Sequence, residues 1–207
     1  MQVPEAMWSG TPFAINGGTM KYYISEPPIH IRSFKELKKA EAQVYYDWYI
    51  GECKNRILLL KERVNEDIDC SFDYSVDSLK VVWSWFENNI SFEELSEDEY
   101  ANKINDYPEW MHPYVSQRTI SMETLIYGLD IAIYFAEVII RNNPSIHWGY
   151  YEKPKNRSSV NQPVLLGFKF DKEMNPREIV VNCIRKSDKE LDPNRLYDLY
   201  HVWKNFI

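Results

Sequence analysis

The pattern of apolar and polar residues predicts a long, mostly apolar helix at Ser121–Asn142, which Asn143-Pro144 ends. Most of its positions hold Leu, Ile, Val, Phe, Ala or Met. A helix that is apolar over most of its circumference normally lies in the centre of a core. Helical spacing then places its polar residues along one narrow stripe. The stripe consists of Glu123, Tyr127, Asp130, Tyr134, Glu137 and Arg141.

A second long helix is expected nearer the N-terminus, from Phe34 to about Asn65. Ser33, followed three residues later by Glu36, has the spacing of a capping box at its start. Gly51 lies in the middle of this helix, and a kink or break there is left open. The expected core contacts of this helix are Phe34, Leu37, Val44, Tyr45, Trp48, Ile57, Leu60 and Val64.

Three shorter helices complete the helical part of the prediction. One runs from Ser78 to about Asn89, with apolar residues on one face. A short one is expected near Glu93–Ile104, within an acidic stretch. The last follows Asp192 as its cap, with Pro193 in the first helical position.

Strands are expected at both ends of the chain. Near the N-terminus, the segments FAI and MKYYI flank Asn16-Gly17-Gly18, which suits a tight hairpin turn. Ile146–Tyr151 and Val164–Phe170 are rich in aromatic and β-branched residues and predict two further strands. Asn175–Arg185 fits a strand or a short helix, and Ile179–Ile184 favours the strand.

These elements predict an α+β fold, a mainly helical single domain over residues 1–207 with a small antiparallel sheet in its C-terminal third. Residues 1–32 form an N-terminal arm or hairpin, 33–142 the helical part, and 143–207 the strands and the C-terminal helix. The sheet is expected to pack on the central helix and to cover its apolar surface.

The negative charge is concentrated in one segment. The formal net charge of the chain is −7, and Glu87–Glu109 alone carries −7, with eight acids and one base. This argues against nucleic-acid binding, which needs a basic surface. The segment is either a solvated acidic loop or a surface that attracts a basic partner. The candidate partner-binding acids are Glu93, Glu94, Glu97, Asp98 and Glu99.

Composition excludes several other classes of protein. Three widely spaced cysteines, with no CxxC pair, favour a reducing compartment over a disulfide framework or a zinc site. There is no secretion signal and no apolar run long enough for a membrane span, so we expect a cytoplasmic protein. No catalytic motif and no metal-ligand spacing of the histidines is present, so we expect no metal and no cofactor.

The polar stripe of the central helix is the best candidate for a ligand site. Asp130 and Glu137 lie seven residues apart, about 10 Å along a helix, so they cannot share a proton or clamp one small metal alone. Tyr134 lies between them. Three interpretations stay open: a structural polar seam, a groove for a partner or ligand, and a catalytic site.

Trp148 and Asn161 flank a basic loop that lies next to the predicted strands. Asn161 precedes Gln162-Pro163, so we expect an extended backbone there, and its amide could tie the loop to Glu137. The alternatives are simple anchoring of the loop and an aromatic and basic interface, since interfaces favour Trp, Tyr and Arg.

Four segments resemble a group of soluble proteins from Gram-positive bacteria. They are VYYDWYIGECKNRILLL (Val44–Leu60), DYSVDSLKVVWSWF (Asp73–Phe86), LDIAIYFAEVIIRN (Leu129–Asn142) and NQPVLLGF (Asn161–Phe168). The group commonly has glycine where this chain has Ala136. The resemblance implies no activity and no catalytic residue. In size, acidity and aromatic content the chain is also generally similar to the immunity proteins that neutralise bacterial toxins.

The sequence therefore favours a protein-binding module over an enzyme. In the first hypothesis it sequesters a basic protein partner, in the manner of an immunity protein. In the second it is an enzyme or small-ligand binder that uses the stripe around Asp130 and Glu137. In the third it is a subunit of an assembly, docked through its C-terminal helix, and a homo-oligomer is also left open.

Overall fold

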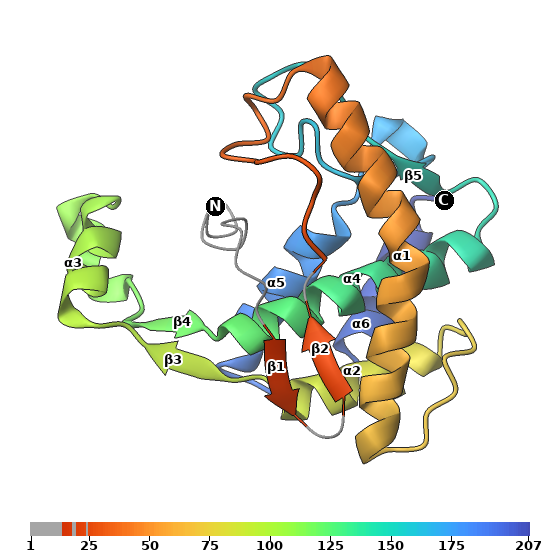
Figure 1. Ribbon diagram of the computed structural model, residues 1–207, viewed down its shortest axis with the longest axis horizontal. Coiled ribbons are helices and arrows are strands. Elements are labelled where there is room, and N and C mark those ends of the chain that lie inside the picture. The colour runs from red at the N-terminus through yellow and green to blue at the C-terminus, as the bar shows by residue number, and fades with distance from the viewer. Residues whose placement is uncertain (1–13, 18–19, 24) are drawn as a thin grey trace.

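The computed structural model describes residues 14–17, 20–23 and 25–207. The chain folds around α4 (Met122–Asn142), which packs against α1 (Lys39–Asp67), α5 (Pro176–Ser187) and α2 (Ser78–Asn88) (Figure 1). Most side chains of α4 are buried, and Ser121 caps its start by accepting the backbone N–H of Thr124. The prediction of a central core helix is confirmed.

Helix α1 begins later than expected. Ser33 does not cap it, because residues 34–36 form a turn in which the Glu36 N–H donates to the Ser33 carbonyl. Helix α1 begins instead after Lys38, whose N–H donates to the Glu41 carboxylate at 2.8 Å. It continues without a break through Gly51, whose surroundings are open.

The buried face of α1 is also shifted from the expected one. Val44 is exposed, so its assignment to the core is wrong. The face follows helical spacing and presents both apolar residues and one arginine to the interior. Its buried residues are Ala42, Tyr45, Tyr49, Cys53, Arg56, Ile57, Leu60 and Val64.

The segment 176–187 is helix α5, so the preference for a strand at Ile179–Ile184 is wrong. The side chain of Asn175 accepts the N–H groups of Arg177 and Glu178, and Pro176 takes the first helical position. These local signals, together with packing on α4, outweigh the β-branched run Ile-Val-Val.

Helix α6 (Arg195–Lys204) covers α2 and begins later than the predicted cap. Asn194 occupies the cap position, while Asp192 accepts the Asn194 N–H in the turn before it. Tyr200 is buried, and Tyr197 and Trp203 pack against the core. The aromatic side chains of α6 are therefore committed to the fold, which removes the support for a docking helix.

The strands form separate two-stranded antiparallel ladders rather than one sheet. In the C-terminal third, β5 (His147–Gly149) pairs with β6 (Val164–Leu166), as expected, with Trp148 opposite Leu165. This ladder contacts α4 through Trp148. The expectation that it covers α4 is wrong, since α1, α5 and α2 do so.

The two strands of the expected N-terminal hairpin pair, but two residues of its predicted turn lie in a strand. Strand β1 (Ala14–Gly17) pairs with β2 (Met20–Tyr23), so Asn16 and Gly17 belong to the strand. Gly18, the third residue of the predicted turn, lies outside the described residues. From β2, Tyr22 is buried against α4.

A projecting arm, residues 92–120, extends away from the helical body (Figure 1). It consists of β3 (Phe92–Glu94), α3 (Glu97–Asn105), the 3-10 helix η2 (Glu109–Tyr114) and β4 (Arg118–Ile120). One further 3-10 turn, η3 (Lys169–Asp171), lies after β6. The whole is a mainly helical α+β fold, as predicted. Across the described ranges, none of the helices combines the length and apolarity needed to span a bilayer.

Candidate functional site

The polar residues along the stripe of α4 contact different parts of the structure. Asp130 is 1% exposed and forms a two-pronged ion pair with Arg56 of α1, at 2.8 Å from Nε and 2.6 Å from Nη2. It also accepts the hydroxyl of Tyr22. Burial raises the pKa of the Asp130 carboxyl, and the Arg56 guanidinium opposes that shift. The ion pair joins α1 to α4, which gives Asp130 a structural role.

Tyr134 and Glu137 point to other neighbours. The Tyr134 hydroxyl lies 2.7 Å from the Ser78 hydroxyl at the start of α2. Glu137 accepts the indole N–H of Trp148 at 3.1 Å and lies 3.5 Å from Nε of Arg141. The residues of the stripe therefore form separate polar contacts between α4 and the elements around it. They do not bring Asp130, Tyr134 and Glu137 into one site.

Asn161 anchors its loop, though not to the predicted group. Its side-chain amide donates to the carbonyl of Phe34 at 2.7 Å, just before α1, rather than to Glu137. The expected extended backbone is wrong, because Asn161 has φ 59°. Asparagine tolerates this left-handed conformation better than most residues, and here it brings the amide under the turn before α1.

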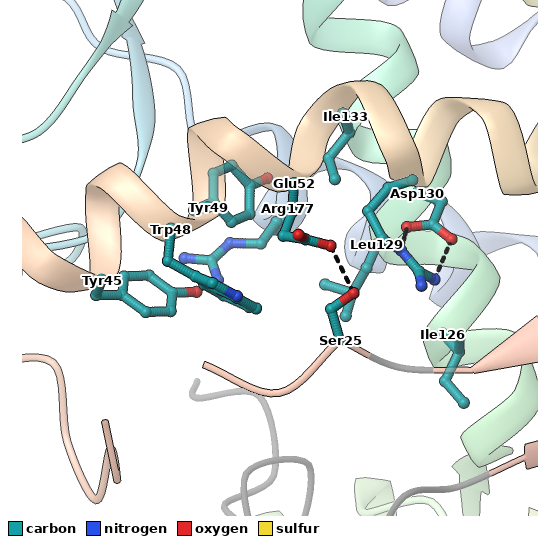
Figure 2. Close-up of a pocket in the computed structure, with 11 residues that line it drawn as sticks. Ser25, Tyr45, Trp48, Tyr49, Glu52, Ile126, Leu129, Asp130, Ile133 and Arg177 are labelled. Carbon is teal, nitrogen blue, oxygen red and sulfur yellow. Dashed lines mark hydrogen bonds and ion pairs between the residues drawn. The ribbon is translucent and has the colours of Figure 1, made fainter. Parts of the chain in front are cut away.

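A cavity opens beside Asp130 between α1, α4 and α5 (Figure 2). Its volume is about 50 Å³, and its walls are mostly apolar. Neither Tyr134 nor Glu137 lines it, so Asp130 is the one residue of the predicted stripe site that does. The lining residues are Ser25, Tyr45, Trp48, Tyr49, Glu52, Arg56, Ile126, Leu129, Asp130, Ile133 and Arg177.

Sequence reasoning missed the two arginines of this cavity. Arg56 lies among apolar residues of α1, and Arg177 follows Asn175-Pro176. The Asn-Pro signal would have placed Arg177 in the first turn of a helix rather than in a strand. No sequence signal pointed to its burial, which depends on the contact of its guanidinium with the Tyr45 hydroxyl.

The acidic residues of the projecting arm are exposed. Glu93, Glu94, Glu97, Asp98 and Glu99 are all on the surface. Ser96 and Glu99 form a capping box that starts α3, and three acids in its first turn suit the positive end of the helix. Arg118 reduces the charge only at Glu94, at 3.5 Å.

The arm also displays aromatic side chains. On η2, Trp110 is 72% exposed and Tyr114 is 82% exposed. Neither α3 nor η2 buries a single residue. Among the described residues, Phe170 is the remaining large aromatic side chain that is strongly exposed. The arm thus combines a negative surface with two aromatic groups that make no core contact.

The base of the arm is fixed to the body by polar contacts. The Ser91 and Ser121 hydroxyls lie 2.6 Å apart at the start of α4, and the Ser91 N–H donates to Thr124. Arg118 bonds Asp188 at the end of α5 at 2.6 Å. Lys103 donates to the Ser116 carbonyl at 2.8 Å and to the Arg118 carbonyl at 3.2 Å, and so holds α3 against the start of β4. These contacts give the arm a defined direction.

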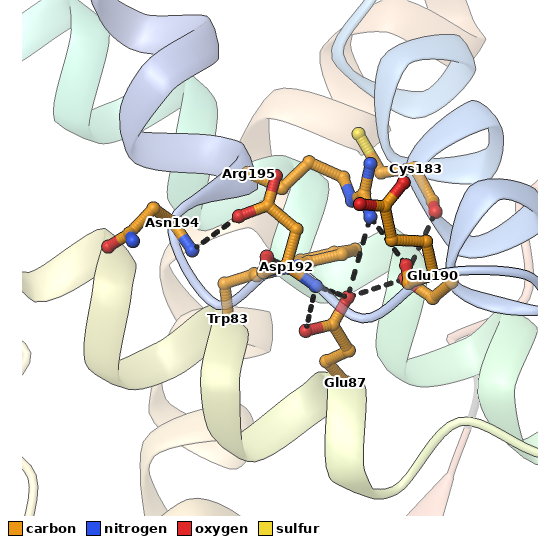
Figure 3. Close-up of polar contacts among 8 residues, drawn as sticks. Trp83, Glu87, Cys183, Glu190, Asp192, Asn194 and Arg195 are labelled. Atoms are coloured by element: carbon orange, nitrogen blue, oxygen red, sulfur yellow. Dashed lines mark hydrogen bonds and ion pairs between the residues drawn. The ribbon is translucent and has the colours of Figure 1, made fainter.

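Glu87 departs from the acidic surface to which the sequence assigned it. It is buried, and its carboxylate accepts the Ser187 hydroxyl at 2.7 Å and the Asp192 N–H at 2.9 Å (Figure 3). Arg195 lies 3.9 Å away. Glu87 thereby holds the α5–α6 connection against α2, while the indole N–H of Trp83 donates to the Asp192 carbonyl.

The cysteines have the environment of core residues. Burial raises the pKa of Cys53 to about 12 and that of Cys183 to about 11, which keeps both thiols protonated and unreactive. Within the described ranges, no group of three or more His, Cys, Asp or Glu side chains is arranged to hold a metal ion.

Comparisons with known proteins add no assignment to this geometry. No family model matches the chain, and neither a curated protein nor a solved structure matches it. A functional conclusion therefore rests on the arm and on the cavity.

Proposed function

We propose that this chain is a protein-binding module that engages a partner with a basic surface through the projecting arm. The observation that carries the proposal is that Trp110 and Tyr114 are exposed on η2, and that neither η2 nor the neighbouring α3 buries any residue in the core. Trp and Tyr are enriched among the residues that dominate binding energy at interfaces. An immunity-type inhibitor that sequesters a basic toxin is one instance of this function.

The charge of the arm favours a basic partner. Residues 92–120 contain seven acids and two bases, Lys103 and Arg118, for a formal charge of −5 out of −7 for the whole chain. Such a concentrated field speeds association with an oppositely charged surface and makes the rate depend on salt. The aromatic pair then supplies apolar contact area at the centre of the interface.

The anchoring of the arm also supports binding. Because Ser91, Ser121 and Arg118 fix its base, the arm presents its surface in one direction before the partner arrives. Pre-organisation of this kind reduces the entropy that binding must spend on ordering a surface.

The aromatic contribution is tested with Trp110→Ala, using Phe170→Ala as the matched control, since Phe170 is equally exposed but lies outside the arm. A native extract is passed over each immobilised variant, and bound proteins are quantified by mass spectrometry. We expect a protein held by wild type and by the control to bind Trp110→Ala at least about 30-fold more weakly, in keeping with a loss of about 2 kcal/mol or more.

The electrostatic contribution is tested with a five-fold neutralised arm: Glu93→Gln, Glu94→Gln, Glu97→Gln, Asp98→Asn and Glu99→Gln. Gln at 99 preserves an acceptor for the capping box. The control neutralises five exposed acids of the body: Glu36→Gln, Glu62→Gln, Asp69→Asn, Glu178→Gln and Asp198→Asn. The arm variant should bind more slowly and with a weaker salt dependence than the control. Equal affinity and salt dependence for both variants would contradict the proposal.

A further inference from the structure

The cavity between α1, α4 and α5 contains two buried polar atoms that have no hydrogen-bond partner among the described residues. They are Nε of Arg177 and the hydroxyl of Tyr49. Arg177 is 4% exposed and Tyr49 is 7% exposed, and both side chains line the cavity (Figure 2). The guanidinium carbon of Arg177 lies 5.6 Å from the centre of the Tyr49 ring. Both donors therefore belong to side chains that line one cavity.

The two arginines of the cavity differ in the groups that neutralise their positive charge. Arg56 faces the Asp130 carboxylate at 2.6 Å. Arg177 has only neutral acceptors in the described part of the chain, namely the Tyr45 hydroxyl at 3.0 Å and the Gln162 side-chain oxygen at 3.1 Å. The faces of aromatic rings offset part of its charge, as the 5.3 Å distance to the Phe34 ring shows. A buried guanidinium normally has a carboxylate or phosphate partner.

We propose that this cavity binds a small organic monocarboxylate, whose carboxylate accepts from Arg177 Nε and from the Tyr49 hydroxyl. A bound carboxylate would provide Arg177 with a negative counter-charge, as Asp130 does for Arg56. The apolar body of the ligand would lie against Leu129 and Ile133, which line the same space. A volume of about 50 Å³ limits the ligand to a few non-hydrogen atoms.

Glu52 restricts the charge of the ligand. It lines the same cavity, where its carboxylate accepts the Ser25 hydroxyl at 2.6 Å. Glu52 would repel each negative charge of a ligand, and Arg177 offsets one of them, so a dicarboxylate or a phosphate is disfavoured relative to a monocarboxylate. The site therefore selects one negative charge with an apolar remainder.

The test uses three probes of similar size at matched ionic strength. Propionate carries the predicted chemistry, propionamide is its neutral counterpart, and malonate carries two negative charges. Thermal unfolding and isothermal titration are followed with the full chain. Propionate should raise the melting temperature in a saturable manner. Propionamide lacks the negative charge that Arg177 would bind, and malonate adds a second charge that Glu52 would repel. Both should therefore bind at least about tenfold more weakly than propionate.

Three variants locate the binding. Arg177→Met should abolish the propionate effect. Because loss of a buried arginine can also prevent folding, Tyr49→Phe is the deciding variant: it removes only the unpartnered hydroxyl, should fold, and should bind propionate about five- to tenfold more weakly. Tyr46→Phe is the matched control, since Tyr46 lies on α1 but does not line the cavity. It should bind as wild type does.

Several outcomes would overturn this assignment. They are equal effects of propionate and propionamide, unchanged binding by Tyr49→Phe, or no saturable effect of any probe, which would leave ordered water as the occupant of the cavity. The assignment is independent of the arm. Trp110→Ala should therefore keep full propionate binding whether or not a protein partner exists.

Discussion

Replacing Glu87 by Gln tests whether a buried carboxylate holds α6 in place. In the native protein its oxygens accept the Ser187 hydroxyl at 2.7 Å and the Asp192 N–H at 2.9 and 3.0 Å, with Arg195 3.9 Å away. Gln removes the charge from these bonds and turns one acceptor into a donor that faces another donor. Hydrogen bonds to charged groups contribute about 1.5–3 kcal/mol, and a buried donor left without a partner costs about 1–3 kcal/mol.

We therefore expect Glu87→Gln to lower the free energy of unfolding by about 3 kcal/mol. For a chain of this length that corresponds to a fall in melting temperature of roughly 6–12 °C. The control is Glu190→Gln, the same chemical change at an exposed side chain nearby; Glu190 contributes only its backbone carbonyl, which accepts from Arg195. Urea and thermal unfolding of both variants are compared with wild type. If Glu87→Gln is as stable as Glu190→Gln, the network in Figure 3 does not hold the α5–α6 connection.

Two further predictions concern helix packing and alkaline stability. Gly51→Ala should raise the free energy of unfolding by about 0.5–1 kcal/mol, because its added carbon meets open space; Gly128→Ala should lower it by about 1–2 kcal/mol, because the carbon lies 2.8 Å from Ile184. Urea unfolding checks both, and equal effects would contradict the packing of α5 on α4. Raised thiol pKa values, about 12 for Cys53 and about 11 for Cys183, mean that the folded state holds protons that the unfolded state releases. These two thiols should therefore contribute no pH dependence below about pH 9, and above it each should lower stability by about 1.4 kcal/mol per pH unit until its folded-state pKa is reached, a slope that Cys53→Ala should reduce.

Hydrophobic spacing was enough to predict the elements that the core defines. The central helix and α2 have apolar residues on faces that α1, α5 and α6 cover, so their sequence pattern reflects their burial directly. The pairing of β5 with β6 followed from two aromatic and β-branched segments. In each case the local preference and the tertiary contacts favour the same structure.

The sequence could not predict which polar groups meet. Asp130 and Glu137 share a helix face, yet they have different partners: Glu137 meets Arg141 of its own helix and Trp148, whereas Asp130 meets Arg56 of α1. Arg56 is 74 residues away in sequence, and only the packing of α1 on α4 brings it to Asp130. The acidic run was equally ambiguous: Glu87 turns inward while Glu93 and Glu97 are exposed. Charge alone does not distinguish a buried hydrogen-bond acceptor from a solvated surface group.

The ladder of β3 and β4 makes the arm a replaceable unit. The chain leaves the body and returns to it on adjacent strands, with Glu94 opposite Arg118 and the Leu95 N–H bonded to the Gln117 carbonyl. Residues 95–117 can thus be exchanged for a two-residue hairpin turn such as Asn-Gly without moving either end. The shortened chain would serve as a scaffold on which arms of other sequence are grafted, while the cavity and the helical core stay as they are.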